Sequence, residues 1–167
     1  MEKFVLKSSD DVSFEVEEAV VRQCKVLLPM VEDCAGRVCP IMNVTGKILE
    51  KVVEYCKKHV VVVDGGDSSS SSSDDDYVLK KWDAEFITKM DLSTVYDLIT
   101  AANYMDIKGL LDLTCQRVAD EIAACKDHKE IREKFGIESD FTAEEEADLL
   151  KENAWVLGPK DLRNKLP

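Results

Sequence analysis

The sequence predicts an α+β fold, with a small sheet at the N-terminus followed by helices over most of the remaining chain. Residues 4–6 and 12–16 alternate between apolar and polar and flank the polar residues 8–11, a pattern typical of a β-hairpin. Beyond them, apolar residues recur at the spacing of amphipathic helices. With 167 residues, 45% of them hydrophobic, the chain can bury one substantial core but not two large independent ones.

The first helical segments follow the hairpin. Helical spacing extends over 17–33 but includes Pro29, which lacks an N–H and disfavours helical geometry at the preceding residue. We therefore expect two short helices, separated at Pro29. The next helix has Thr45 as its N-cap and ends at 57–59, where Lys, Lys and His suit the negative end of the helix dipole.

An acidic, serine-rich segment interrupts the pattern at 64–76, which reads DGGDSSSSSSDDD. Its composition cannot repay the entropy of ordering, so we predict a disordered loop. Ser71, Ser72 and Ser73 each have an aspartate three positions downstream, a pattern that suits an acid-directed kinase. The alternative is a plain flexible spacer, and mass spectrometry of the native protein would distinguish the two.

Three further helices are predicted between this loop and residue 123. A short one begins at Asp83, and Ser93 caps a second that runs from 94 to about 103. Asp106 caps the third, which has the longest amphipathic pattern in the chain. Its apolar stripe comprises Ile107, Leu110, Leu111, Thr114, Cys115, Val118, Ala119, Ile122 and Ala123.

Two capped helices follow. Asp127 with Glu130, and Thr142 with Glu145, have the spacing of capping boxes, and the acidic run 144–146 suits the positive end of the helix dipole. Gly136 fits a left-handed stop for the first of these helices.

Several large apolar residues in this region have no local partner. Phe135, Ile137, Phe141 and Trp155 lie at helix ends or in loops, outside any periodic stripe, and the last helix offers a face made mostly of alanine. Strong caps, weak self-packing and unpartnered aromatics together indicate a segment whose core is completed by another protein. The alternative is that Phe135, Phe141 and Trp155 fold back onto the chain's own core.

The composition narrows the class of partner. A net charge of −12 argues against nucleic acid and against an anionic membrane, since both attract positive patches. The chain has no apolar run of transmembrane length and no secretory signal, so we expect a soluble intracellular protein. Of its six cysteines, Cys56 and Cys115 fall on apolar stripes and are expected to be reduced thiols packed as small hydrophobes.

No catalytic constellation is present in the sequence. Only His59 and His128 offer a general base, and both fall at predicted helix ends. Glycine-rich phosphate loops are absent, and we expect no catalytic residue and no cofactor. A zinc site drawn from Cys34, Cys39, Cys56 and His59 is a weak alternative, because no Cys-x2-Cys pair supports it.

Several motifs in a fixed order closely resemble the Skp-type adaptor subunit of SCF ubiquitin ligases, in a plant-like form. They are KSSDDVSFEVEEAV from Lys7, NVTGKILEKVVEYCKKHV from Asn43, WDAEFI from Trp82, AANYMDIKGLLDLTCQRVADEI from Ala101, EIREKFGIESDFTAEEE from Glu130 and KENAW from Lys151. The resemblance implies a BTB/POZ-type domain over 3–125, related to elongin C, that docks on a cullin scaffold. It also implies an F-box-binding helical extension over 126–157, followed by an atypical tail over 158–167.

The resemblance also implies roles for particular residues. Asn103 and Tyr104 match the segment that faces the cullin. Residues at matching positions for F-box binding are Phe135, Ile137, Phe141, Asn153 and Trp155, with Cys115, Val118 and Ile122 on the edge of the preceding helix. The implied role is a non-catalytic adaptor of the nucleus and cytoplasm that bridges an F-box receptor to a cullin and, through it, to a RING subunit.

The chain departs from the family pattern at three positions. Pro29 stands where the family usually keeps a helix, Met42 where a proline usually precedes Asn-Val, and Ala154 where a glutamine usually precedes the tryptophan. An alternative function is therefore an F-box-binding relative with a weakened cullin contact that serves a non-ligase complex.

Overall fold

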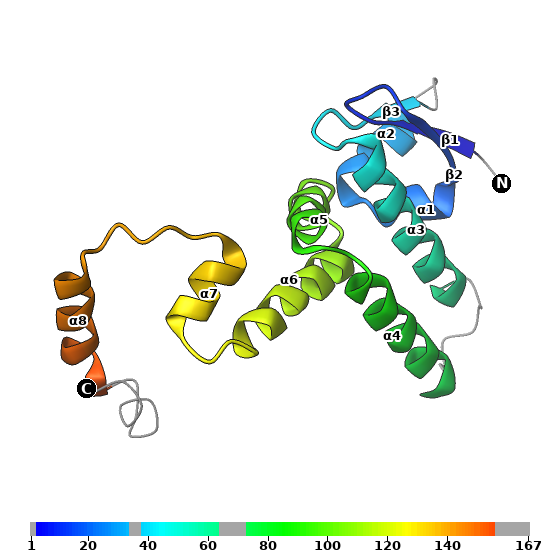
Figure 1. The fold of residues 1–167 in the computed structure, drawn as a ribbon. Coiled ribbons are helices and arrows are strands. Elements are labelled where there is room, and N and C mark those ends of the chain that lie inside the picture. The colour runs from blue at the N-terminus through cyan, green and yellow to red at the C-terminus, as the bar shows by residue number, and fades with distance from the viewer. Residues whose placement is uncertain (1–2, 34–37, 64–72, 156–167) are drawn as a thin grey trace. The chain divides into compact units, whose positions relative to one another are not determined.

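The computed structural model describes residues 3–33, 38–63 and 73–155 (Figure 1). The chain divides into two compact units, Met1–Ala123 and Ala124–Pro167. Each unit is described by itself below. Among the helices of the described ranges, none combines the length and the apolar character that a membrane span requires.

A three-stranded sheet opens the N-terminal unit. β1 (Lys3–Lys7) pairs antiparallel with β2 (Ser13–Glu17), with Phe4 opposite Val16, so the predicted hairpin is confirmed. β3 (Val38–Pro40) joins the other edge of β1 in parallel, giving the order β2-β1-β3. The sequence did not predict β3, because three residues are too short to show an alternating pattern.

The hairpin turn is fastened to the start of α3 (Gly46–Val63) by Asp10. Its Oδ1 accepts hydrogen bonds from the Ser8 hydroxyl at 2.5 Å and from the Gly46 backbone N–H at 2.7 Å. These two bonds hold the pKa of Asp10 below its ordinary value. A single carboxylate thus accepts one hydrogen bond from the hairpin turn and one from a free backbone N–H at the start of a helix.

The region 17–33 contains α1 (Glu18–Val21), the 3-10 turn η1 (Lys25–Leu27) and α2 (Leu28–Asp33). The predicted separation at Pro29 is wrong, because the chain leaves the α-helix directly after α1. Pro29 is the second residue of α2, where a missing N–H removes no bond within the helix. The helix that the resemblance associates with this position is therefore present.

α3 begins at Gly46, directly after Thr45, but it continues to Val63 and not to 57–59 as predicted. Val60 is partly buried against the core, so burial favours continuing the helix past the basic residues. Tyr55 and Cys56 are both buried on its inner face.

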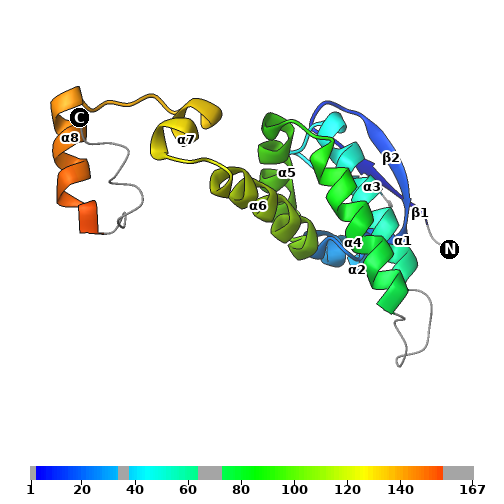
Figure 2. The same cartoon turned by 60° about the horizontal axis from the view of Figure 1, so that its bottom comes forward.

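α4 (Ser73–Thr88) corrects two predictions. The predicted loop 64–76 is wrong at its C-terminal end, because residues 73–76 form the first turn of α4. The rest of that loop, residues 64–72, lies outside the described residues, and so do Ser71 and Ser72 of the predicted kinase sites. The helix start predicted at Asp83 is also wrong. Trp82 and Phe86 stack with ring centroids 4.8 Å apart, and Phe86 is buried beside Tyr55 of α3, so packing extends the helix. Figure 2 shows the ribbons of α3 and α4.

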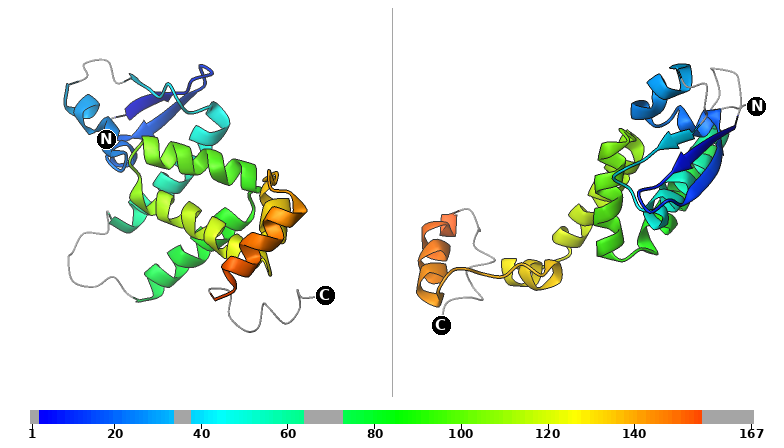
Figure 3. Two further views of the ribbon diagram at one scale, coloured as in Figure 1. Left: turned by 90° about the vertical axis from the view of Figure 1, so that its left-hand side faces the viewer. Right: turned by 90° about the horizontal axis from the view of Figure 1, so that it is seen from above.

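α5 (Leu92–Tyr104) and α6 (Lys108–Ala123) pack against each other (Figure 3). The cap predicted at Ser93 is wrong: Asp91 caps α5, accepting a hydrogen bond from the Thr94 N–H at 3.2 Å. Asp106 does not cap α6 either. Its φ of 50° is left-handed, whereas an N-cap residue has extended geometry.

The core of the N-terminal unit lies between the sheet, α1, α3, α5 and the first half of α6. Its most completely buried members are Leu6, Val21, Cys24, Cys39, Leu49, Val52, Cys56, Val95, Leu98, Ala102 and Leu110. Cys24, Cys39 and Cys56 are free thiols, as predicted for Cys56.

The C-terminal unit contains α7 (His128–Phe135) and α8 (Ala143–Glu152), joined by an extended segment (Figure 1). Neither helix contains a buried residue. Within the part that the structure describes, this unit therefore has no core of its own comparable to that of the N-terminal unit.

Candidate protein-binding site

The apolar stripe of α6 leaves the core halfway along the helix. Leu110 and Thr114 are fully buried, and the Thr114 hydroxyl donates to the Leu110 carbonyl at 2.8 Å. One turn later Val118 is half-buried, and Ile122 exposes 42% of its surface. The helix therefore presents an apolar edge that the N-terminal unit does not cover.

Cys115 lies on this uncovered edge. It is exposed, so the prediction that its thiol packs into the core as a small hydrophobe is wrong. Its exposure agrees with the second prediction for this residue, that it belongs to a binding edge with Val118 and Ile122. The three are brought together by the spacing of α6.

Local hydrogen bonds hold the helices of the C-terminal unit. The Asp127 carboxylate accepts from the backbone N–H groups of Lys129 and Glu130 at 2.9 and 3.0 Å, and Gly136 ends α7 with a φ of 63°. Thr142 and Glu145 form a reciprocal capping box at the start of α8. The Gly136 stop and the Thr142 capping box are confirmed. Asp127 caps α7 as predicted, but the capping box with Glu130 is not formed, because the Glu130 carboxylate accepts from the Lys126 N–H at 2.7 Å instead.

The large apolar residues of this unit are mostly exposed. Ile137 exposes 54% of its surface, Phe141 47% and Trp155 83%, whereas Phe135 is half-buried. The alternative that Phe141 and Trp155 fold back onto the chain's own core is therefore wrong. Exposed aromatics on capped helices are typical of a surface that another protein covers.

Asn153, the remaining residue predicted for F-box binding, ends α8. Its side-chain amide donates to the Leu149 carbonyl at 2.8 Å, and the residue is exposed. Part of its hydrogen-bonding capacity is thus committed to the helix end, which fixes the orientation of the amide two residues before Trp155.

A polar contact between α7 and α8 was missed by the sequence reasoning. Glu146 Oε1 lies 2.7 Å from His128 Nε2 and 3.1 Å from Arg132 Nη1. The hydrogen bond with His128 holds the pKa of Glu146 below its ordinary value. The available signal was the spacing of His128 and Arg132, which places both on one face of α7.

The residues predicted to face the cullin lie at the end of α5. Asn103 is exposed, and Tyr104 is partly buried against the core. Met42, one of the departures from the family pattern, follows β3 and exposes 69% of its surface. Asn103 and Tyr104 both belong to the N-terminal unit.

The residues considered for zinc have other partners. His59 Nδ1 lies 2.9 Å from the Tyr55 carbonyl, and its Nε2 lies 3.4 Å from Asp83. The hydrogen bond with Cys24, together with burial, raises the pKa of the Cys56 thiol, which disfavours the thiolate that zinc requires. Cys34 lies outside the described residues, within which no cluster of His, Cys, Asp or Glu suited to a metal is found.

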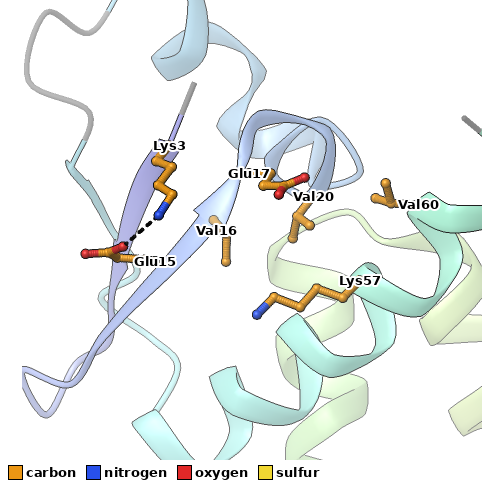
Figure 4. Close-up of a pocket in the computed structure, with 7 residues that line it drawn as sticks. All are labelled: Lys3, Glu15, Val16, Glu17, Val20, Lys57 and Val60. Carbon is orange, nitrogen blue, oxygen red and sulfur yellow. Dashed lines mark ion pairs between the residues drawn. The ribbon is translucent and has the colours of Figure 1, made fainter. Parts of the chain in front are cut away.

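An open pocket of about 400 Å³ lies between the hairpin, α1 and α3 (Figure 4). Val16, Val20 and Val60 contribute its apolar lining. The charged residues around it are Lys3, Glu15, Glu17 and Lys57, of which Lys3 and Glu15 form an ion pair at 3.6 Å. None of the predicted binding residues lines this pocket.

The fold and the exposed surfaces define a class of protein. A small α+β unit carries an apolar edge on its last helix, and a capped helical extension presents aromatic side chains to solvent; this is a protein-binding module.

Comparison with known proteins identifies the family. Residues 2–61 match the tetramerisation domain of the Skp1 family, and residues 108–156 match its dimerisation domain. SKP1-like protein 14 of Arabidopsis thaliana is 56% identical over 155 residues, which cover 92% of this chain and 96% of that protein. SKP1-like protein 1 of Oryza sativa subsp. japonica is 55% identical over 162 residues, covering 90% and 92%.

The chain belongs to the Skp1 family. This confirms the resemblance to Skp-type SCF adaptors of plant-like form, and the α+β fold with a POZ-type unit.

Proposed function

We propose that this chain is a non-catalytic subunit that bridges an F-box substrate receptor to a cullin scaffold. The observation that carries the proposal is the exposure of Ile137, Phe141 and Trp155 on an extension whose helix ends are otherwise well satisfied. A receptor that supplies apolar helices would cover these side chains and the uncovered edge of α6. Family membership supports the same role.

The expected interface is large and partly apolar. Interfaces of permanent complexes commonly bury more than about 2,000 Å², and buried aromatics contribute most strongly to affinity. The F-box contacts proposed here are Cys115, Val118 and Ile122 of α6 and, from the extension, Phe135, Ile137, Phe141, Asn153 and Trp155.

The cullin contact is proposed at Asn103 and Tyr104 of the N-terminal unit. Through the cullin, a RING subunit and its ubiquitin-charged enzyme are brought to the receptor-bound substrate, in the nucleus and cytoplasm. The rate gain comes from proximity, so the adaptor itself needs no catalytic group.

Size-exclusion chromatography with a recombinant F-box protein and a cullin N-terminal domain tests the proposal. We expect a ternary complex. Trp155→Ala should weaken receptor binding while leaving the cullin bound, and Asn103→Arg should weaken cullin binding while leaving the receptor bound. A wild-type chain that binds only one of the two proteins would refute bridging.

A further inference from the structure

Glu146 joins the two helices of the C-terminal unit. It lies in the first turn of α8, and its Oε1 faces two cationic or potentially cationic groups of α7, His128 Nε2 at 2.7 Å and Arg132 Nη1 at 3.1 Å. His128 and Arg132 are four residues apart, so both extend from one face of α7 towards the same oxygen.

The three polar side chains are less exposed than Ile137, Phe141 and Trp155. Their exposed fractions are 32% for His128, 27% for Arg132 and 23% for Glu146, against 83% for the whole of Trp155. In a unit whose described helices have no buried residue, this polar contact links α8 to α7.

We propose that Glu146 is a positioning residue for receptor binding: with His128 and Arg132 it forms an ionic clamp that fixes α8 to α7 before the receptor arrives. This inference rests on the proposed F-box-binding function. The clamp fixes the two ends of the segment that carries Ile137 and Phe141. Affinity rises when a surface is already arranged as its partner requires, because less conformational freedom is lost on binding.

Calorimetric titration with a recombinant F-box domain tests the clamp, using Glu146→Gln and the matched control Glu144→Gln. Each variant removes one negative charge from the first turn of α8, so the change in helix-dipole interaction is similar, but only Glu146 contacts α7. We expect Glu146→Gln to weaken binding about fivefold or more, and Glu144→Gln by less than about twofold.

A double-mutant cycle provides a readout that a general loss of structure would not reproduce. Arg132→Gln and Glu146→Gln each remove one partner of the same contact, so the double variant should lose less affinity than the sum of the two single losses.

The outcomes separate the clamp from the function beneath it. If Glu146→Gln and Glu144→Gln bind equally well, or if the Glu146 and Arg132 effects add, the clamp is refuted while F-box binding stands. If the wild-type chain does not bind F-box domains, the proposed function fails, and the clamp as a device for receptor binding fails with it. Circular dichroism of each variant checks that α8 remains helical.

Discussion

Replacing Trp155 with alanine should separate receptor binding from folding. Trp155 exposes 83% of its surface in the free chain, so it contributes little to the folded state and much surface to any partner that covers it. We expect a change in unfolding free energy within about 0.5 kcal/mol, as for surface substitutions in general.

The loss of affinity follows from the exposed area. A tryptophan can bury up to about 250 Å², and the exposed fraction leaves about 200 Å² for the partner. At about 25 cal/mol per Å², complete burial corresponds to about 5 kcal/mol, an upper bound because cover is seldom complete. We therefore expect Trp155→Ala to cost at least about 2 kcal/mol, or about 25-fold in Kd.

The assay is calorimetric titration with a recombinant F-box domain, paired with thermal unfolding of the free chain. Tyr77→Ala is the matched control, since Tyr77 is another exposed aromatic, at 70%, on α4 of the N-terminal unit. It should leave both affinity and stability unchanged. If Trp155→Ala binds as tightly as Tyr77→Ala, or unfolds the extension, the proposed role of this side chain is wrong.

Three further predictions concern the N-terminal unit. A Cβ at Gly109 would lie 2.7 Å from the Tyr55 hydroxyl oxygen but 3.8 Å from the Tyr55 Cζ, so only the hydroxyl obstructs it. Gly109→Ala should therefore lower the free energy of unfolding by about 1–3 kcal/mol in denaturant titration, and by much less when Tyr55→Phe removes the hydroxyl. A Cβ at Gly46 would lie 2.8 Å from the Val12 Cβ, which cannot rotate away; Gly46→Ala should cost about 1–3 kcal/mol, and an unchanged unfolding midpoint would contradict this. Burial raises the pKa of Asp83 above its ordinary 3.8, although His59 acts in the opposite direction. The folded state therefore binds the Asp83 proton more tightly than the unfolded state does, so the stability of the protein falls as pH rises from about 3.8 through the raised pKa. Asp83→Asn should remove this pH dependence of stability and raise the melting temperature at pH 7. A lower melting temperature would show instead that the pair of Asp83 and His59 is stabilising.

Local signals were the most reliable part of the sequence. The Asp127 cap, the Gly136 stop and the Thr142 capping box each depend on residues within about five positions of one another. Their energetics are settled by neighbouring backbone groups, so distant parts of the chain do not change the outcome.

Predictions failed where distant segments decide the structure. β3 exists because it pairs with β1, and α4 begins early because Trp82 and Phe86 pack beside α3. The α5 cap was predicted at Ser93, but it lies at Asp91, to which the Thr94 N–H and hydroxyl both donate hydrogen bonds.

The exposure of the apolar residues in the extension was predictable from the sequence. A large apolar residue outside any local stripe indicates a missing partner, and exposure of Ile137, Phe141 and Trp155 agrees with that interpretation. The Glu146 contact was not predictable in the same way, because its partners lie on another helix and the acidic run had a sufficient local explanation in the helix dipole.

Under the proposed function, the extension would use different side chains for folding and for binding. Helices of 8 and 10 residues, the lengths of α7 and α8, are only marginally stable in water without support. Here the support is polar, from the caps at Asp127 and Thr142 and from the Glu146 contact, which leaves the aromatic residues free to face a partner. Because preformed helices lose less freedom on association, this division should favour tight binding. It also predicts that an aromatic residue can be removed without unfolding the surface that carries it, whereas removing Glu146 should alter the surface and leave every apolar contact group in place.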